Sequence, residues 1–176
     1  MINITCNNIW VHKKISNLLY QKGLNIIDNE NKNFFLNINI DDREDSVLLI
    51  SREKSYKFIK PIDFMEIYSK IILIILDVEF NFNHLTYFPF RNLILNEKNK
   101  INLGEKHNLI FSYLLINQQA GISKFNLYKK IWPEDVDMQI NKLDTHLTNL
   151  KKFLKTELDY DLNVKSQKNI LKLTIN

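Results

Sequence analysis

Residues 143–154 read Leu-Asp-Thr-His-Leu-Thr-Asn-Leu-Lys-Lys-Phe-Leu, and this stretch decides the fold of the C-terminal half. Together with Ile140, its leucines at 143, 147, 150 and 154 recur every three or four residues, which is the spacing of one buried helix face. We therefore predict a long helix from about Asp137 to Leu154 or a few residues beyond.

The opposite face of this predicted helix is polar and cationic. Only Asp144 is acidic between Asn141 and Lys155, and four lysines give that segment a net charge of +3. Asn and Thr side chains can reach base edges in the major groove of DNA, and Lys contacts phosphates. The face therefore favours DNA, and its predicted contact residues are Asn141, Lys142, Thr145, Thr148, Asn149, Lys151 and Lys152.

The segments on either side predict a winged helix-turn-helix. Ser123 can cap a short helix over 124–131, and Pro133 ends it because Pro interrupts the helix ladder. A terminal hairpin with its tip at residues 166–169 carries two further predicted DNA contacts, Lys165 and, in the tip, Lys168. The other expected elements are a helix over 105–117 and strands over 87–90, 93–95, 101–103, 162–165 and 170–174.

These residues resemble the OmpR/PhoB-type DNA-binding domain over roughly 88–173. The resemblance rests on residues 103–107, 121–127, 131–132 and above all 143–154, which keep the family's Asp-x-His and Leu-Arg/Lys pairs in register. It implies base-facing positions for Thr145, Thr148 and Asn149. It implies backbone or groove-edge contacts for Asn141, Lys142, His146 and Lys151, although a packing role for His146 remains open.

The resemblance also implies that the loop 132–137 touches RNA polymerase. The sequence departs from the family at two places. Thr148 and Asn149 stand where the family usually has Arg, and the wing motif Arg-Gly-x-Gly-Tyr is absent from residues 165–171.

The N-terminal half predicts a small α/β layer. Its expected strands cover 2–6, 24–27, 34–40, 47–50 and 56–59, and its expected helices cover 9–20 and 64–76. Asp63 and Glu66 have the spacing of a capping box before the second helix. This order of elements predicts a sheet with a parallel core.

This half resembles a shortened response-regulator receiver domain of a two-component system. Receivers need an acidic pair after the first strand and an Asp at the end of the third, because aspartyl phosphorylation requires a nucleophile and a cation held by oxygen anions. Amides replace most of these acids, with Asp41-Asp42 just beyond the expected strand. We therefore predict an atypical module that is not phosphorylated. Its degenerate receiver positions are Asn7, Asn8, Asn37, Asn39, Ser51 and Lys60.

The helix over 64–76 has more apolar residues than one buried face needs. A helix that is apolar around most of its circumference requires burial on two sides, and a second subunit would supply the other side. The expected dimer contacts are Met65, Tyr68, Ile72 and Leu76. The open alternative is that the rest of the chain covers this surplus.

Composition excludes several classes of protein. One cysteine, four dispersed histidines and three glycines provide no disulfide framework, no metal motif and no phosphate cradle. No nucleophile–base pair can be named, so we expect neither an enzyme nor a cofactor or metal. The longest apolar run, 71–76, is far shorter than the roughly 20 residues of a membrane span, and no signal segment opens the chain. We therefore expect a cytoplasmic protein with no membrane partner.

Charge divides the chain into halves. Residues 1–83 have a net charge of −1 and residues 84–176 a net charge of +5. We predict a receiver-like dimerisation domain over 1–77, a linker over 78–86 and a winged-helix domain over 87–176. The predicted function is a phosphorylation-independent, dimeric transcriptional regulator that binds double-stranded DNA. The alternative is a protein-interaction module on a winged-helix scaffold that does not bind DNA.

Overall fold

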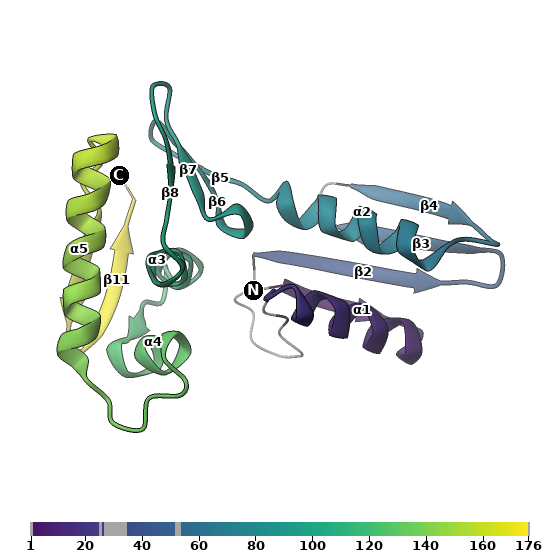
Figure 1. Cartoon of the computed structure of the whole chain (residues 1–176), viewed down its shortest axis with the longest axis horizontal. Coiled ribbons are helices and arrows are strands. Elements are labelled where there is room, and N and C mark those ends of the chain that lie inside the picture. Colours follow the sequence, from purple (N-terminus) through teal and green to yellow (C-terminus); the bar gives the residue numbers. More distant parts are fainter. Residues whose placement is uncertain (1, 25, 27–34, 52–53, 176) are drawn as a thin grey trace. The chain divides into compact units, whose positions relative to one another are not determined.

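The computed structural model describes residues 2–24, 26, 35–51 and 54–175, which fall into two compact units, Met1–Val78 and Glu79–Asn176 (Figure 1). Residues 78–86, expected to be a linker, instead contain β5 (Phe80–Phe82) and the start of β6 (Leu85–Phe88). Both strands belong to a sheet of the second unit. The two-domain α/β plus winged-helix fold class is confirmed.

The first unit contains a mixed four-stranded sheet in the order β1-β2-β3-β4. Its strands are β1 (Ile2–Cys6), β2 (Leu36–Asp42), β3 (Ser46–Ser51) and β4 (Ser55–Ile59). Only β1 and β2 are parallel, and β2-β3-β4 is an antiparallel meander. The expected parallel core is therefore wrong beyond the first pair. The turn between Asp42 and Ser46 is far too short for the crossover that a parallel neighbour requires.

The expected strand over 24–27 is represented by Ile26, which forms an isolated parallel bridge to Ile2. Residues 25 and 27 lie outside the described part of the chain.

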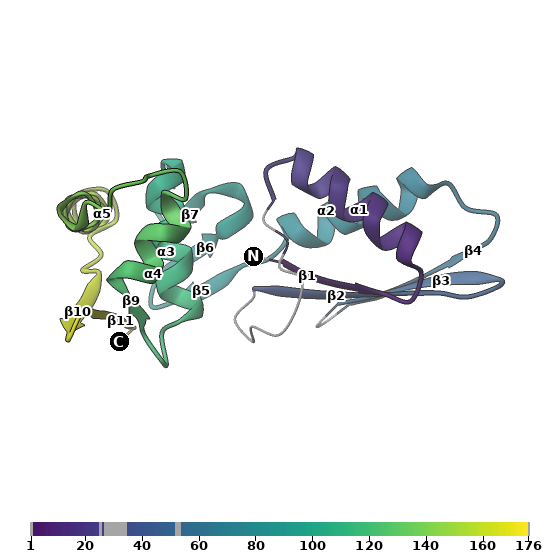
Figure 2. The same cartoon turned by 90° about the horizontal axis from the view of Figure 1, so that it is seen from below.

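Two helices cover one face of this sheet (Figure 2). They are α1 (Ile9–Gln21), which Asn8 caps, and α2 (Phe64–Leu76), which the Asp63 carboxylate caps by accepting the Met65 amide at 2.9 Å. Strand residues alternate between buried and exposed, so Ile38 and Ile40 lie under the helices while Asn37 and Asn39 face away. Such alternation is typical of a sheet with one covered face.

The second unit begins with an antiparallel sheet, β5-β6-β7-β8, whose last strands are β7 (Leu93–Leu95) and β8 (Lys100–Asn102). Three helices follow: α3 (Glu105–Ile116), α4 (Lys124–Ile131) and α5 (Ile140–Leu158). The wing consists of β10 (Asn163–Gln167) and β11 (Ile170–Thr174), with the two-residue β9 (Ile122–Ser123) beside β11.

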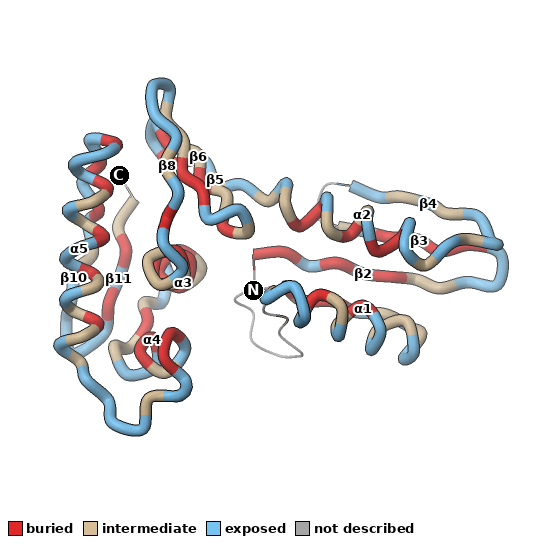
Figure 3. The backbone as a smooth tube through the Cα atoms, in the orientation of Figure 1, coloured by how far each residue is buried: buried red, intermediate tan, exposed pale blue. Residues whose placement is uncertain are grey.

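The leucine stripe of α5 is buried as predicted, and Figure 3 shows the alternation of buried and exposed residues along this helix. Leu143, Leu150 and Leu154 are fully buried. The predicted Ser123 cap is also confirmed, because its hydroxyl accepts the Asn126 amide at 3.1 Å. Packing of α5 on α3 and α4 therefore fixes which face of α5 remains outside.

A buried polar network ties α3 to the preceding sheet. The Tyr87 hydroxyl lies 2.6 Å from Asn108 Oδ1 and 2.7 Å from Ser112 Oγ, and Asn108 donates to the Pro89 carbonyl at 3.0 Å. Burial raises the pKa of Tyr87 well above its usual value, so the phenol stays neutral and donates. The network orients α3, against which α4 and α5 pack.

Among the described residues, no helix is both long enough and apolar enough to cross a membrane.

Candidate nucleic-acid interface

The outer face of α5 carries the candidate interface. Asn141, Thr145, Thr148, Asn149 and Lys152 are exposed on it. An open, shallow hollow in this face is lined by Asn141, Asp144, Thr145, Thr148 and Asn149. The structure therefore brings the expected base-facing positions together on one surface.

The two threonines do not present free hydroxyls. Thr145 Oγ1 donates to the Asn141 carbonyl at 2.8 Å, and Thr148 Oγ1 donates to the Asp144 carbonyl at 2.9 Å. These i−4 bonds occupy the hydroxyl protons. The side-chain amides of Asn141 and Asn149 form no hydrogen bond within the described residues. They are therefore free to bond a base.

His146, which the family resemblance places at the groove edge, faces inward. Its ring lies 5.2 Å from the Trp132 ring and 5.7 Å from the His107 ring, measured between centroids. Its buried Nδ1 has no hydrogen-bond partner among the described residues. Burial, together with the neighbouring His146, lowers the pKa of His107. His146 is thus a packing residue between α3 and the end of α4.

Two of the expected phosphate-binding lysines have contacts within the domain. Lys142 Nζ lies 2.8 Å from Asp135 Oδ2 and stacks over the Trp132 ring. The same carboxylate oxygen accepts the Tyr128 hydroxyl at 2.5 Å, and these bonds, first that from Lys142, lower the pKa of Asp135. Lys151 Nζ donates to the Val164 carbonyl at 3.3 Å. Lys142 therefore anchors the loop before α5, and Lys151 links α5 to the wing.

The acidic residue of the hollow is neutralised by a residue that the sequence did not single out. Lys124 Nζ, from α4, lies 2.6 Å from Asp144 Oδ1. A carboxylate would otherwise repel DNA phosphates. The two residues are twenty positions apart, and no local pattern links them.

The wing presents Lys165 on β10 and Lys168 at its tip, and both are exposed. The turn consists of Lys168 and Asn169, which have φ values of 49° and 63°. Two left-handed residues form a compact two-residue hairpin turn without the glycines of the family's wing. The tip is therefore shorter than the expected 166–169.

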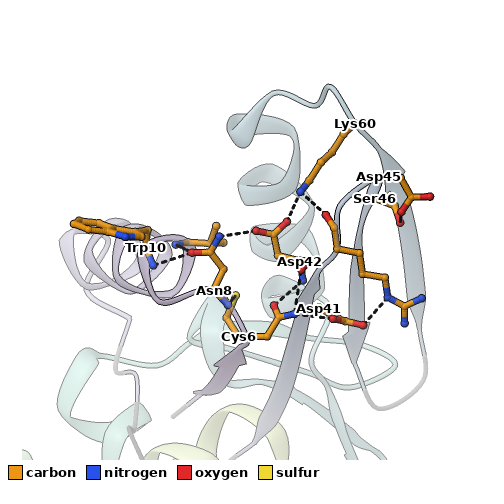
Figure 4. A network of polar contacts seen from close by, with 11 residues as sticks. Cys6, Asn8, Trp10, Asp41, Asp42, Asp45, Ser46 and Lys60 are labelled. Carbon is orange, nitrogen blue, oxygen red and sulfur yellow. Dashed lines mark hydrogen bonds and ion pairs between the residues drawn. The ribbon is translucent and has the colours of Figure 1, made fainter.

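In the first unit, Asn8 and Lys60 gather around Asp42, with Asp41 close by (Figure 4), and Asn7 bonds Asp41. Lys60 Nζ lies 2.7 Å from Asp42 Oδ1, and Asn8 Nδ2 donates to Asp42 Oδ2 at 2.6 Å. Asn7 Nδ2 donates to Asp41 Oδ1 at 2.8 Å. The bonds from Lys60 and then Asn8 lower the pKa of Asp42. Strand β2 extends to Asp42, beyond the predicted end at Ile40, and so delivers this carboxylate to the edge of the sheet.

Asn37, Asn39 and Ser51 do not join this cluster. Asn37 accepts from Asn3 at 3.0 Å, and Asn39 accepts from Thr5 at 3.2 Å, both on the sheet face opposite the helices. Ser51 donates to the Lys54 carbonyl at 3.2 Å. Among the described residues, no group of three or more His, Cys, Asp or Glu side chains is placed to hold a metal ion.

The outer face of α2 differs from the expected dimer surface by one residue. Tyr68 is buried, and its hydroxyl reaches the Leu18 carbonyl at 3.4 Å. Leu73, which the sequence did not single out, is 55% exposed, and Met65 is 50% exposed. With Ile72 and Leu76 half-buried, the apolar stripe on this face is Met65, Ile72, Leu73 and Leu76.

Residues 98–167 match the family model described as "Transcriptional regulatory protein, C terminal". This segment extends from the β7–β8 turn to the end of β10 and includes all three helices. The three helices of the C-terminal unit thus lie within a segment that matches the C-terminal domain of transcriptional regulatory proteins.

Several solved structures are similar to parts or all of the chain. The DNA-binding domain of Escherichia coli CadC is 15% identical, covering 55% of this chain and 91% of its own, with a TM-score of 0.47. The C-terminal domain of the nisin resistance regulator NsrR is 24% identical (53% and 93% covered, TM-score 0.41). Response regulator DrrB of Thermotoga maritima, an OmpR/PhoB homologue, is 14% identical (98% of both chains, TM-score 0.47). A search of curated proteins gives no match.

Proposed function

We propose that this chain, whose residues 98–167 match a transcriptional-regulator domain, is a sequence-specific DNA-binding regulator that acts in the cytoplasm as a homodimer and without phosphorylation. One observation carries the proposal: the outer face of α5 offers two free amides, Asn141 and Asn149, beside an acidic residue already neutralised by Lys124. Asn, like Gln, can bond both N6 and N7 of adenine in the major groove. We infer that α5 reads adenine-containing half-sites.

Of the lysines predicted to contact DNA, Lys152, Lys165 and Lys168 form neither an ion pair nor a side-chain hydrogen bond among the described residues, and the phosphate contacts are assigned to these three. Binding to a duplex selected from a random pool should weaken steeply with salt. For three phosphate contacts the slope of log K against log[salt] should be about −2.7. Fluorescence anisotropy between low and physiological ionic strength measures this slope.

The rival function is a protein-interaction module that does not bind DNA. A winged-helix fold does not by itself establish DNA binding. Lack of binding to every duplex, even at the lowest salt, would favour this rival and overturn the proposal.

Phosphorylation independence is supported by the cluster around Asp42. The Asp42 carboxylate is bonded on both oxygens by Lys60 and Asn8. Asn7 and Asn8 donate amide protons at positions where a divalent cation would need oxygen anions. We infer that the amides and the ammonium replace the cation, so the module is receiver-like in arrangement but inactive.

A small-molecule phosphodonor with Mg²⁺ should leave the mass of the unmodified chain unchanged. The double variant Asn7→Asp/Asn8→Asp places four carboxylates together, and Mg²⁺ should raise its melting temperature because ligands of the folded state stabilise it. Mg²⁺ should not alter the melting temperature of the unmodified chain. Phosphoryl transfer to the unmodified chain, seen by mass spectrometry, would refute this part of the proposal.

Dimerisation is assigned to the stripe on α2, and contact with RNA polymerase to the loop before α5. Val136 in this loop is 93% exposed, while Asp135 beside it is fixed by Tyr128 and Lys142. The loop thus presents one exposed apolar side chain beside an anchored residue, where a protein partner could contact it.

A further inference from the structure

The wing hairpin concentrates positive charge. Residues 163–174 contain three lysines, Lys165, Lys168 and Lys172, and no acidic residue. All three side chains are exposed. Within the described part of the chain, none of the three forms a hydrogen bond or an ion pair through its side chain. The hairpin therefore carries a local charge of +3 that no described residue compensates.

Lys165 and Lys172 face each other across the hairpin. They are directly paired in the antiparallel register of β10 and β11. Directly opposite side chains have Cβ atoms about 5 Å apart, and like charges at this separation are unfavourable. The core-facing alternation of β11 places Leu171 and Leu173 inside, so Lys172 is on the outer face together with Lys165.

Lys168 also occupies an unfavourable position. Its φ of 49° lies in the left-handed region, which Asn tolerates better than Lys because its short polar side chain bonds locally. Asn is the commoner residue in this chain, with 24 occurrences against 21 for Lys, so composition alone does not explain a lysine here. The wing thus carries its three lysines despite two independent local penalties.

Lysines that destabilise the free hairpin are favourable once an anion lies between them. We propose that the Lys165–Lys172 pair clamps one phosphate of the DNA backbone, and that Lys168 at the tip contacts a second phosphate. This proposal rests on the DNA-binding function proposed above, and it adds Lys172, which the sequence did not single out. Lys168 is three residues from Lys165, or about 10 Å along an extended strand, so one phosphate cannot serve both sites.

Helix α5 is hydrogen-bonded to the strand that carries this site. Lys151 Nζ of α5 donates to the Val164 carbonyl, and Val164 directly precedes Lys165 on β10. A DNA backbone bound along the outer face of α5 therefore passes next to Lys165, the first residue of the clamp. The wing would hold the backbone, while Asn141 and Asn149 select the sequence.

The test uses the full chain and four variants: Lys165→Gln, Lys172→Gln, the double variant, and Lys57→Gln as the control. Lys57 is an exposed strand lysine of the other unit, so the control removes the same charge from a similar site. Each wing variant should weaken binding to selected and unrelated duplexes alike, by roughly 3- to 10-fold at physiological salt. Because two lysines share one phosphate, the double variant should reduce the salt slope by about 1 rather than 2.

Melting temperature provides an independent readout. Removing one of two opposed lysines relieves repulsion, so each single wing variant should melt at the same temperature as the unmodified chain or about 1–3 °C higher. A fifth variant, Lys172→Arg, keeps the charge and should keep the affinity. If the double variant has the affinity and slope of Lys57→Gln, the clamp is refuted and the proposed function stands. If the unmodified chain binds no duplex, both are refuted.

Discussion

Replacing Asn141 and Asn149 together by Ala should remove most of the preference of the protein for its selected DNA site. These side chains are exposed on α5 beside two threonines whose hydroxyls already bond to the helix backbone. A well-placed amide–adenine pair contributes about 1–3 kcal/mol of discrimination, so losing two pairs should cost roughly 30- to 10⁴-fold in the ratio of specific to non-specific affinity. Anisotropy with the selected duplex and a scrambled duplex measures this ratio.

The non-specific affinity and its salt slope should remain unchanged, because neither Asn carries charge. Folding should not suffer, since Ala has a higher helix propensity than Asn. Asn17→Ala, at an exposed position of α1, is the matched control. An unaltered ratio in the double variant would mean that α5 does not read bases through these amides.

Introducing charge on the stripe of α2 should separate the proposed dimer. Met65 and Leu73 are half or more exposed, so Met65→Glu/Leu73→Glu should disrupt a subunit contact without disturbing the core beneath it. Sedimentation should then show monomers. Linked half-site binding exceeds single-site affinity by about 10²- to 10⁴-fold, and this gain on a two-half-site duplex should be lost.

Binding to a single half-site should stay as before, because the recognition face is in the other unit. Trp10→Glu is the control on α1, where the indole is 79% exposed. If Trp10→Glu separates the dimer and the α2 variant does not, the interface lies on α1. If the unmodified chain sediments as a monomer both free and on DNA, the homodimer is refuted.

The C-terminal domain could be predicted well because its sequence signals are periodic and local. The leucine stripe of α5 and the Ser123 cap each depend on residues within a few positions of one another. The first sheet was less predictable. Its strands could be located, but their direction depends on the length of the turn between Asp42 and Ser46, and the predicted end of β2 at Ile40 hid how short this turn is.

The sequence predicted which face of α5 forms the candidate site, but not which polar and charged groups on that face already have partners. Helical spacing identified which residues lie outside, and it did not show that Lys142 binds Asp135 or that Lys124 neutralises Asp144. These partners come from other elements, so only the tertiary fold reveals them. The same limit applies to α2, where Tyr68 and Leu73 differ in exposure because α1 covers one side.

The ladder of side-chain pairs on the first sheet bears on the order of folding. Asn3–Asn37, Thr5–Asn39 and Asn7–Asp41 join β1 to β2 across 34 positions of sequence, whereas β2, β3 and β4 are joined by short turns. Closing the longer loop has the greater entropic barrier, so we expect the meander to form before β1 docks onto it. A one-residue slip would place Ile2 and Ile4 on the polar side and break every rung. The ladder therefore favours a single register when β1 docks.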